Sequence, residues 1–306
     1  MLTSPWASWH AETDPTAVTV GVFDGVHLGH RTLIDRLRAT GLVPTVLTFD
    51  PHPAEVLSPG THPRLITSID ERLALLEGAG VELVGVLDLG EIRHLHPGEF
   101  VTQVLEERLA MAAMVMGTDF HFGKDRSGDV AFLRSAGDLN GFKVEVVELQ
   151  TVDGIVSSSG IRALLELGEV RKAEVLLGSR YLMSNVVVHG DKRGREIGFP
   201  TANLEPPDRK VIPGIGVYAA FASLEGQRHQ AAVNVGVRPT FGGGELVVEA
   251  YLLDFNDDCY GETVTLEFVE RLRPELKFAG VPELVEQMTD DVVKVRHILS
   301  VEPKGA

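Results

Sequence analysis

The sequence of 306 residues contains a single cysteine, Cys259, and no long apolar run. One thiol cannot form an intramolecular disulfide bond or a zinc site built from cysteines, which favours a reducing compartment. No stretch approaches the roughly 20 apolar residues that cross a bilayer. The N-terminal segment lacks the basic start and apolar core of a signal peptide, so we expect an exposed lead-in and a cytoplasmic protein without contact with membranes.

Positive charge is scarce as well. Lysine and arginine total 28 against 44 aspartate and glutamate residues, which gives a formal net charge of −16. This is the wrong sign for a protein that holds nucleic acid through its phosphates, so no nucleic-acid partner is expected. Hydrophobic residues make up 44% of the chain and charged residues 24%, which is typical of globular proteins. A chain of this length predicts two domains of about 150 residues each.

The first half of the chain alternates short apolar runs with amphipathic stretches. The strands of a parallel sheet alternate with helices in this way, and ligands bind at the carboxyl ends of such strands. The pattern predicts strands at residues 19–23, 43–49, 82–89, 112–117 and 142–149, and helices at residues 27–40, 69–80 and 98–111. Two helices joined near Gly168 are expected next, over residues 156–179.

After residue 180 the pattern changes to β-rich runs broken by glycine, proline and aspartate. These runs predict an antiparallel sheet or barrel with strands at residues 185–191, 216–224, 228–237, 245–255 and 262–272, and a terminal helix at 284–299. We therefore expect an α/β protein with two domains, residues 1–180 and 181–306. The motif GIGVYA at residues 214–219 matches a dinucleotide fingerprint, but a strand-forming run follows it where that motif needs a helix.

The string GVFDGVHLGH joins the first strand to the first helix. His27 and His30 lie three residues apart, hence on one face of that helix at its start. Backbone N–H groups at a helix N-terminus attract anions, and two imidazoles there can donate to phosphate oxygens while Gly25 and Gly29 let the backbone approach. This arrangement predicts a phosphate-binding loop whose histidines stabilise charge on a departing pyrophosphate.

Two other interpretations of the histidines compete with phosphate binding. Isolated histidines with this spacing are often ordinary turn residues. A zinc site is the second interpretation, but the spacing lacks the i, i+4 pair and the glutamate of a metalloprotease helix, and the HLHP segment at residues 94–97 adds no convergent ligand. The position between a strand and a helix favours phosphate binding over both.

Three further segments follow strands or open a helix near the expected carboxyl edge of the sheet. TFDPHP and MGTDFHFGKDRSGD offer polar and aromatic groups for the rim of a flavin or nucleotide site, namely Asp50, His52, Asp119, Phe120 and Phe122. SSSGIR, at a helix start, offers groups that can reach polyphosphate oxygens, namely Ser158, Ser159 and Arg162. Taken alone, the three segments also fit a rigid turn, a solvated loop with one buried phenylalanine, and a helix cap.

The second half has a separate signal, VVHGDKRGREIGFPTANL. Its glycine-rich basic loop permits contact with phosphates through Gly190, Lys192, Gly194 and Arg195. Thr201 and Asn203 share a face of an extended segment, and their oxygens suit Mg²⁺ held by ATP phosphates. An asparagine-stabilised turn is the alternative. Glu249, in the apolar run ELVVEAYLL, is a candidate base for a substrate hydroxyl, or an outward-facing residue opposite a basic neighbour.

The motifs GVFDGVHLGH, TFDPHP, MGTDFHFGK and SSSGIR resemble, in order and spacing, the FMN adenylyltransferase module of prokaryotic bifunctional riboflavin kinase/FAD synthetases. That resemblance implies a Rossmann-like HxGH nucleotidyltransferase domain in which both histidines bind ATP phosphates and Arg162, with the preceding serines, holds the polyphosphate. We also place Gly21 and Phe23 in this phosphate site. Ser159 stands where the family usually has threonine, and Arg31 where glutamine is common.

The second half resembles the riboflavin kinase module of the same family through GREIGFPTANL, NVGVRPTFGG, VEAYLLDF and RLRPELKF. That module is a six-stranded antiparallel β-barrel with a terminal helix. The resemblance implies that Thr201 and Asn203 ligate Mg²⁺ and that Glu249 is the catalytic base. It also implies that ATP phosphorylates riboflavin to FMN with release of ADP, and that a second ATP then adenylylates FMN to FAD with release of pyrophosphate. The alternatives are another HxGH nucleotidyltransferase and a flavin-binding carrier without turnover.

Overall fold

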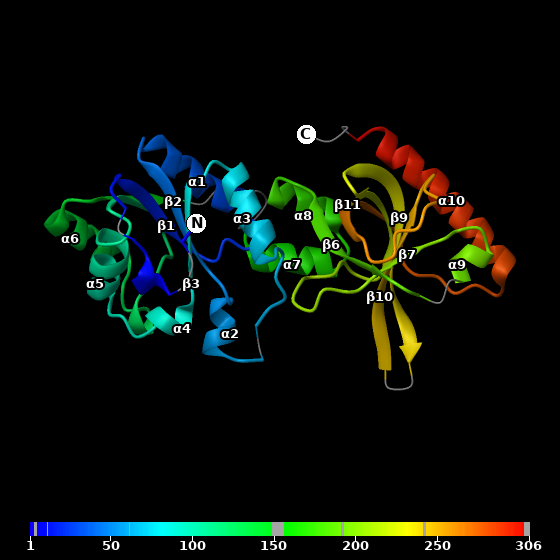
Figure 1. Cartoon of the computed structure of the whole chain (residues 1–306), viewed down its shortest axis with the longest axis horizontal. Coiled ribbons are helices and arrows are strands. Elements are labelled where there is room, and N and C mark those ends of the chain that lie inside the picture. Colours follow the sequence, from blue (N-terminus) through cyan, green and yellow to red (C-terminus); the bar gives the residue numbers. More distant parts are fainter. Residues whose placement is uncertain are drawn as a thin grey trace. The chain divides into compact units, whose positions relative to one another are not determined.

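The computed structural model describes residues 1–2, 5–10, 12–60, 62–148, 156–190, 193–240 and 243–302. The chain divides into two compact units, Met1–Ser158 and Ser159–Ala306, which run from blue to green and from green to red in Figure 1. Within the described ranges, no helix is long and apolar enough to cross a membrane.

A five-stranded sheet forms the centre of the first unit. Its strand order is β3-β2-β1-β4-β5, and neighbouring strands are parallel throughout, as predicted. After β3 the chain crosses to the other side of β1, so the carboxyl ends of β1 and β4 flank the switch point at which open α/β sheets bind ligands. The strands are β1 (Thr16–Val20), β2 (Val43–Phe49), β3 (Leu83–Leu87), β4 (Met111–Gly117) and β5 (Lys143–Val147).

Helices pack on both faces of this sheet. Successive strand residues point to opposite faces, so Ala17 and Val18 belong to two separate apolar clusters, one shared with α1 and α3 and the other with η2 and α6. The predicted helix at 98–111 forms as a short α-helix followed by the wider turns of a π-helix. The helical segments are η1 (Trp6–Ser8), α1 (Leu28–Ala39), α2 (Pro53–Leu57), α3 (Ile69–Gly78), α4 (Leu89–Ile92), α5 (Pro97–Glu99), η2 (Phe100–Glu106), η3 (Lys124–Arg126) and α6 (Val130–Asn140).

Leu2 and Trp9 attach the N-terminal segment to the first unit, whereas most of the segment's described residues are exposed, as expected. Leu2 lies along the edge of β3, where its N–H donates to Val84 O at 2.8 Å and its carbonyl accepts from Val86 N–H at 2.7 Å. Trp9 is 4% exposed and belongs to one of the two apolar clusters. Burial of the large Trp9 indole ring stabilises this attachment.

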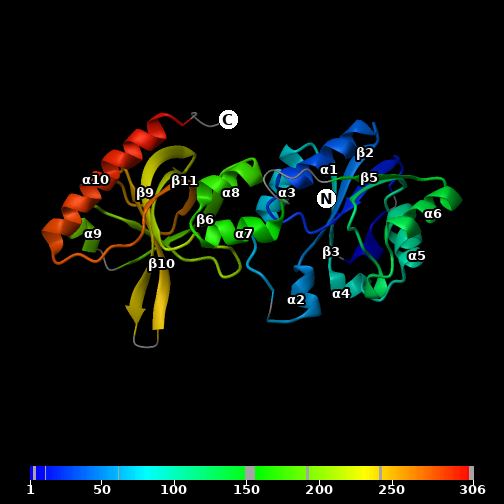
Figure 2. The same ribbon diagram turned by 180° about the vertical axis from the view of Figure 1, so that it is seen from behind.

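A closed β-barrel forms the centre of the second unit. Its strand order is β10-β7-β6-β11-β8-β9, and every strand pair is antiparallel, as predicted. Figures 1 and 2 show β9 and β10 continuing together as a ribbon past the rest of the barrel. The strands are β6 (Tyr181–Val188), β7 (Ala202–Leu204), β8 (Gly216–Leu224), β9 (Gln227–Thr240), β10 (Gly243–Leu252) and β11 (Thr263–Arg273).

The helices of the second unit are α7 (Ser158–Glu166), α8 (Val170–Leu177), α9 (Arg193–Glu196) and α10 (Val281–Ser300). The terminal helix α10 packs Val295 and Leu299 against the barrel residues Ala219 and Phe221. Residues of α7 belong to this unit too, since Leu165 O accepts from Gly214 N–H at 2.9 Å. The compact units therefore divide after Ser158, whereas the boundary of the two functional modules at residues 180 and 181 stays a prediction.

Candidate active sites of the two units

Helix α1 begins at the histidine pair, as the sequence predicts. His27 is the N-cap residue, and its Nδ1 accepts from the His30 N–H at 3.4 Å. The two imidazole rings stack with centroids 3.6 Å apart and an interplanar angle of 15°. A Cβ on Gly29 would lie 3.2 Å from the His27 ring, so a larger residue there would push this ring away. The spacing of the motif thus holds both rings at the positive end of the helix dipole.

The turn before α1 adopts an unusual backbone conformation. Phe23 and Val26 have φ angles of 54° and 40°, a region that costs energy for bulky and β-branched residues. Asp24, between them, is 1% exposed, and its carboxylate accepts from the N–H groups of Ile66 at 2.9 Å and Thr67 at 3.0 Å. These charge-assisted hydrogen bonds hold the turn in place. The sequence interpretation gave Asp24 no role, because its partners lie about forty residues away.

The pKa of His30 differs from that of an exposed histidine. Burial, with smaller contributions from His27 and Arg72, lowers the pKa of His30 well below its usual range. Its Nδ1 is buried without a hydrogen-bond partner among the described residues. The ring is therefore neutral near pH 7.

Arg72 lies near the histidines, and the sequence interpretation missed it. It is 1% exposed, and its Nη1 donates to Thr48 Oγ1 at 3.1 Å and to Phe49 O at 2.9 Å, at the carboxyl end of β2. Burial lowers the pKa of this guanidinium, while Asp24 and Asp50 raise it. The sequence held one indication that Arg72 is buried. Arg72 lies four residues before the apolar Leu76, so both fall on the same face of α3.

The other predicted residues of the first unit follow the carboxyl ends of its strands. Asp50 is exposed after β2, and His52 Nδ1 accepts from the Ala54 N–H at 3.1 Å as the N-cap of α2. Asp119 is exposed after β4, and the nearby Phe120 is half-buried. Phe122 stacks on Phe120 with centroids 5.5 Å apart but is 8% exposed and belongs to the core. Phe122 therefore supports the Phe120 ring from the protein interior.

The SSSGIR motif spans the point at which the two units divide. Ser158, the last residue of the first unit, donates from its Oγ to Asp24 O in the glycine turn at 3.0 Å. Arg162 Nη1 donates to Ser159 Oγ at 3.5 Å within the second unit. Contact of Ser159 and Arg162 with a nucleotide stays a prediction.

In the barrel, polar residues of the second site lie directly opposite one another on three neighbouring strands. Glu249 on β10 pairs with Asn203 on β7 and with Asn234 on β9. Paired residues point to the same face of a sheet, and all three line a pocket of about 740 Å³. Glu249 thus faces the pocket, although a basic neighbour is also present, because Arg238 Nη2 lies 3.9 Å from its Oε1. Asn234 was not predicted from the sequence, since only the register places it beside Glu249.

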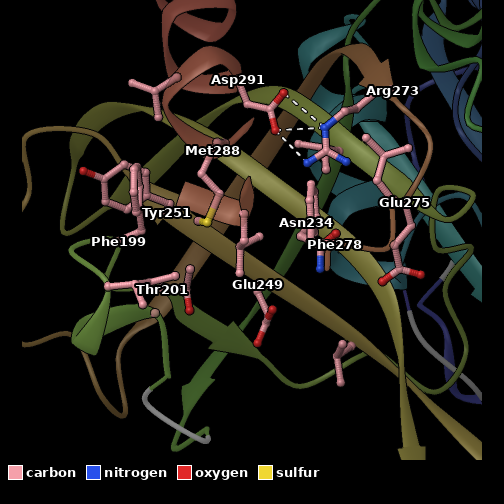
Figure 3. A pocket seen from close by; sticks show the side chains of 18 of the residues that line it. Phe199, Thr201, Asn234, Glu249, Tyr251, Arg273, Glu275, Phe278, Met288 and Asp291 are labelled. Carbon is pink, nitrogen blue, oxygen red and sulfur yellow. Dashed lines mark hydrogen bonds and ion pairs between the residues drawn. The ribbon is translucent and has the colours of Figure 1, made fainter. Parts of the chain in front are cut away.

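The apolar part of this pocket's lining comes from α10 and the segment before it. It comprises Leu276, Phe278, Leu284, Met288 and Val292. Figure 3 shows Arg273 from the end of β11 joined to Asp291 on α10, while Thr201 and Glu249 lie at the other side of the view. The volume and the mixed lining are those of a site for a small organic molecule with one apolar and one polar part.

A second, smaller pocket of about 340 Å³ shares Thr201 with the first. Its lining includes Arg195, Tyr260 and Cys259, and burial, with the charges of Asp258 and Glu262, raises the pKa of the Cys259 thiol. Thr201 thus borders both pockets, so a ligand in each could meet beside its hydroxyl. A raised pKa keeps the thiol protonated, which argues against Cys259 as a nucleophile.

The donor atoms around Thr201 fit a hard cation. The Thr201 hydroxyl, the Asn203 amide and the Glu249 carboxylate line one pocket and offer oxygen ligands, which Mg²⁺ prefers. Among the residues that the structure describes, no group of three or more histidine, cysteine, aspartate or glutamate side chains could hold a metal ion. A cation here would therefore share its coordination with substrate phosphates.

The predicted phosphate loop of the barrel is described in part. Gly190 lies beside Asn203, since a Cβ on Gly190 would come within 2.4 Å of Asn203 Nδ2. Gly194 and Arg195 lie in α9, and Gly194 lines the first pocket. Lys192 lies outside the described residues.

Comparison with known proteins decides the family. The FAD synthetase family matches residues 10–160 and the riboflavin kinase family matches residues 177–299. The bifunctional riboflavin kinase/FMN adenylyltransferase of Bacillus subtilis is 36% identical over 299 residues, which cover 95% of this chain and 94% of that protein. The chain belongs to the bifunctional riboflavin kinase/FMN adenylyltransferase family. The protein of that name from Pseudomonas fluorescens is 38% identical over 285 residues, 91% of each chain.

A solved structure shares the fold of this chain over nearly its whole length. A crystal structure named macrolide-efflux protein, from Streptococcus pneumoniae, matches with a TM-score of 0.88 and 33% identity, over 97% of this chain and 99% of that chain. The transport function in that name refers to the pneumococcal protein. The resemblance of both halves to this family, inferred from their motifs, is confirmed.

Proposed function

We propose that the two units carry out consecutive steps of flavin cofactor synthesis. The second unit phosphorylates riboflavin with ATP to give FMN, and the first unit adenylylates FMN with ATP to give FAD. Within the structure, the observation that carries the kinase step is the placement of Glu249 between Asn203 and Asn234 at the polar side of the large pocket. An isoalloxazine ring suits the apolar wall, which leaves the ribityl chain to reach the carboxylate.

In the kinase step, we assign the smaller pocket to ATP and the larger one to riboflavin. The ribityl hydroxyl then meets the γ-phosphate near Thr201, which borders both pockets. Glu249 accepts the hydroxyl proton as the oxygen–phosphorus bond forms and ADP departs. Thr201 and Asn203 are the proposed ligands of Mg²⁺, which when bound neutralises charge on the ATP phosphates. Gly190, Lys192, Gly194 and Arg195 form the proposed phosphate loop.

In the adenylyl step, the FMN phosphate is already a nucleophile, so no strong base is needed. A phosphate oxygen of FMN attacks the α-phosphorus of ATP, and pyrophosphate leaves. His27 and His30 stack at the start of α1, where their N–H groups and the helix dipole stabilise charge on the departing group. Neutral His30 costs little to keep buried before ATP binds, because it carries no charge that needs solvation.

The remaining predicted residues of the adenylyl site take supporting roles in this proposal. Arg162, with Ser158 and Ser159, would hold the polyphosphate, while the backbone around the glycine turn would approach it through Gly21, Phe23, Gly25 and Gly29. The rim of the flavin or nucleotide site would comprise Asp50, His52, Asp119 and Phe120, with Phe122 beneath Phe120. We propose a cytoplasmic enzyme that needs no nucleic acid or membrane partner.

Product analysis tests the proposed function directly. The purified chain is incubated with riboflavin, ATP and Mg²⁺, and flavins are separated by chromatography. FMN followed by FAD is the expected result, with ADP and pyrophosphate released in turn. FMN without FAD would contradict the adenylyl assignment and point to another nucleotidyltransferase substrate. Flavin binding without any product would instead support a carrier.

A further inference from the structure

Arg72 of α3 is a buried arginine that contacts two separate parts of the proposed adenylyl site. Its side chain is 1% exposed, and its Nη1 donates both to Thr48 Oγ1 at 3.1 Å and to Phe49 O at 2.9 Å. We propose that Arg72 is a positioning residue of the adenylyl step, which holds the glycine turn at residues 21–26 in a fixed relation to the segment after β2. This inference rests on the proposed FMN adenylyltransferase function of the first unit.

The contact with the glycine turn passes through Thr48. This residue is completely buried, and its hydroxyl accepts from Arg72 Nη1 and donates to Val22 O at 2.8 Å. A guanidinium can only donate hydrogen bonds, so the single hydroxyl proton of Thr48 is left for another acceptor. Arg72 therefore directs that proton to the carbonyl of Val22, in the turn that leads to His27.

The second contact holds the segment after β2. Phe49 is the last residue of β2, and its carbonyl accepts from the same Nη1. The chain continues directly into Asp50 and His52, which are predicted rim residues. The charges of Asp24 and Asp50 also act on Arg72, since both raise the pKa of its guanidinium. One buried cation thus joins the phosphate turn to the rim of the same site.

The glycine turn depends on contacts of this kind, because its backbone is strained. Phe23 and Val26 have φ angles of 54° and 40°, and such conformations persist only where the surrounding structure holds them. Just before α3, Thr67 Oγ1 accepts from Gly25 N–H at 3.0 Å. The start of α3 and the residue before its N-cap therefore support the turn at two points, through Thr67 and through Arg72.

Stability alone gives little reason for an arginine at this position. Arg72 Nε is buried without a hydrogen-bond partner among the described residues. A buried charge whose donors are incompletely used is often no more stabilising than an apolar side chain of similar size. A methionine should therefore be tolerated by the fold while it removes both contacts with the site.

The test compares Arg72→Met and Arg72→Lys with the wild-type full chain. Initial rates of pyrophosphate release from FMN and ATP report the adenylyl step. For Arg72→Met we expect kcat and kcat/KM to fall together by about 10²-fold, as for a small misplacement of the reacting groups. Lysine keeps the charge without the planar fork, so it should recover part of the rate.

The variant Thr48→Val tests the path through the hydroxyl. Valine keeps the shape of threonine and leaves the contact of Arg72 with Phe49 O, so we expect a smaller fall of about tenfold, the effect of one hydrogen bond. The double variant Arg72→Met/Thr48→Val should be no slower than Arg72→Met, because the hydroxyl acts through the arginine. Effects that multiply would overturn the proposed path.

Two controls separate positioning from loss of folding. Arg108 is a half-buried arginine of the same unit whose Nη1 donates to Trp9 O at 2.8 Å, and Arg108→Met should leave pyrophosphate release unchanged. Urea unfolding shows whether the first unit of each variant is folded in the assay. A folded Arg72→Met variant with wild-type kcat would overturn the proposal. A wild-type chain that releases no pyrophosphate from FMN and ATP would overturn the adenylyltransferase function itself.

Discussion

Asp291 on α10 accepts hydrogen bonds from Nε and Nη2 of Arg273 at the end of β11, with nitrogen–oxygen distances between 2.7 and 3.1 Å. Gln287 Nε2 also donates to Asp291 Oδ1 at 3.0 Å. Because Asp291 is 3% exposed, this cluster fastens the terminal helix to the barrel at the edge of the proposed riboflavin pocket. The position of the apolar wall of that pocket therefore depends on a buried ion pair.

Asp291→Ala should destabilise the second unit. Removing one partner of a buried pair leaves an uncompensated charge, so we expect the free energy of unfolding to fall by about 3–5 kcal/mol. The KM for riboflavin should rise as α10 loosens, while adenylylation of supplied FMN continues. Urea unfolding and the two product assays measure these effects. Substitution of both partners by methionine and leucine should recover much of the stability, and an equal loss in the double variant would argue against the charge-based explanation.

His27→Ala should impair FAD formation and spare riboflavin phosphorylation. Loss of one preorganised donor to the departing group predicts a fall in the adenylyl rate of about 10²–10³-fold. The same change also removes the N-cap of α1, at a cost of about 1 kcal/mol. His27→Asn is the matched control, because asparagine is a good N-cap residue. It should restore stability but not the adenylyl rate, and equal loss of both activities in a folded variant would contradict separate sites.

Glu249→Gln should nearly abolish FMN formation. The amide keeps the size of the side chain but cannot accept the hydroxyl proton, and loss of a general base typically costs about 10²–10⁴-fold in rate. The variant should still convert supplied FMN to FAD, because that step belongs to the first unit, and urea unfolding serves as the control for folding of the barrel. Chromatography of the flavins after each reaction gives the rates of FMN and FAD formation. Full kinase activity in this variant would remove Glu249 from its role as the base.

Stability should depend on pH through His30. Its native pKa lies below the usual value of 6.5 because of burial, so the unfolded chain binds a proton that the native chain does not bind as pH falls below about 6.5. The free energy of unfolding should thus decrease with falling pH, by at most about 1.4 kcal/mol per unit from this group. This loss should be absent at higher pH. Urea titrations of wild type and His30→Asn between about pH 5 and 8 should show a flatter profile for the variant, and identical profiles would contradict the assignment.

Local patterns were enough to predict several features of this protein. The alternation of apolar runs with amphipathic stretches predicted the parallel sheet, and the β-rich runs predicted the barrel and α10, because side-chain periodicity follows neighbours along the chain. The start of α1 at His27 and the turn at Gly168 followed for the same reason. Motifs in order and spacing were sufficient to predict the family.

Other features depended on contacts between residues far apart in the chain. Asp24 holds its turn through Ile66 and Thr67, and Trp9 is buried against the sheet despite its polar surroundings. Asn234 and Arg238 join Glu249 only through the register of β9 with β10. A shift of one residue would turn their side chains to the opposite face. Sequence periodicity predicted most strands and the longer amphipathic helices, but not β7 or α6. The tertiary structure decided which residues meet at a site, because register and burial are settled by packing over the whole fold.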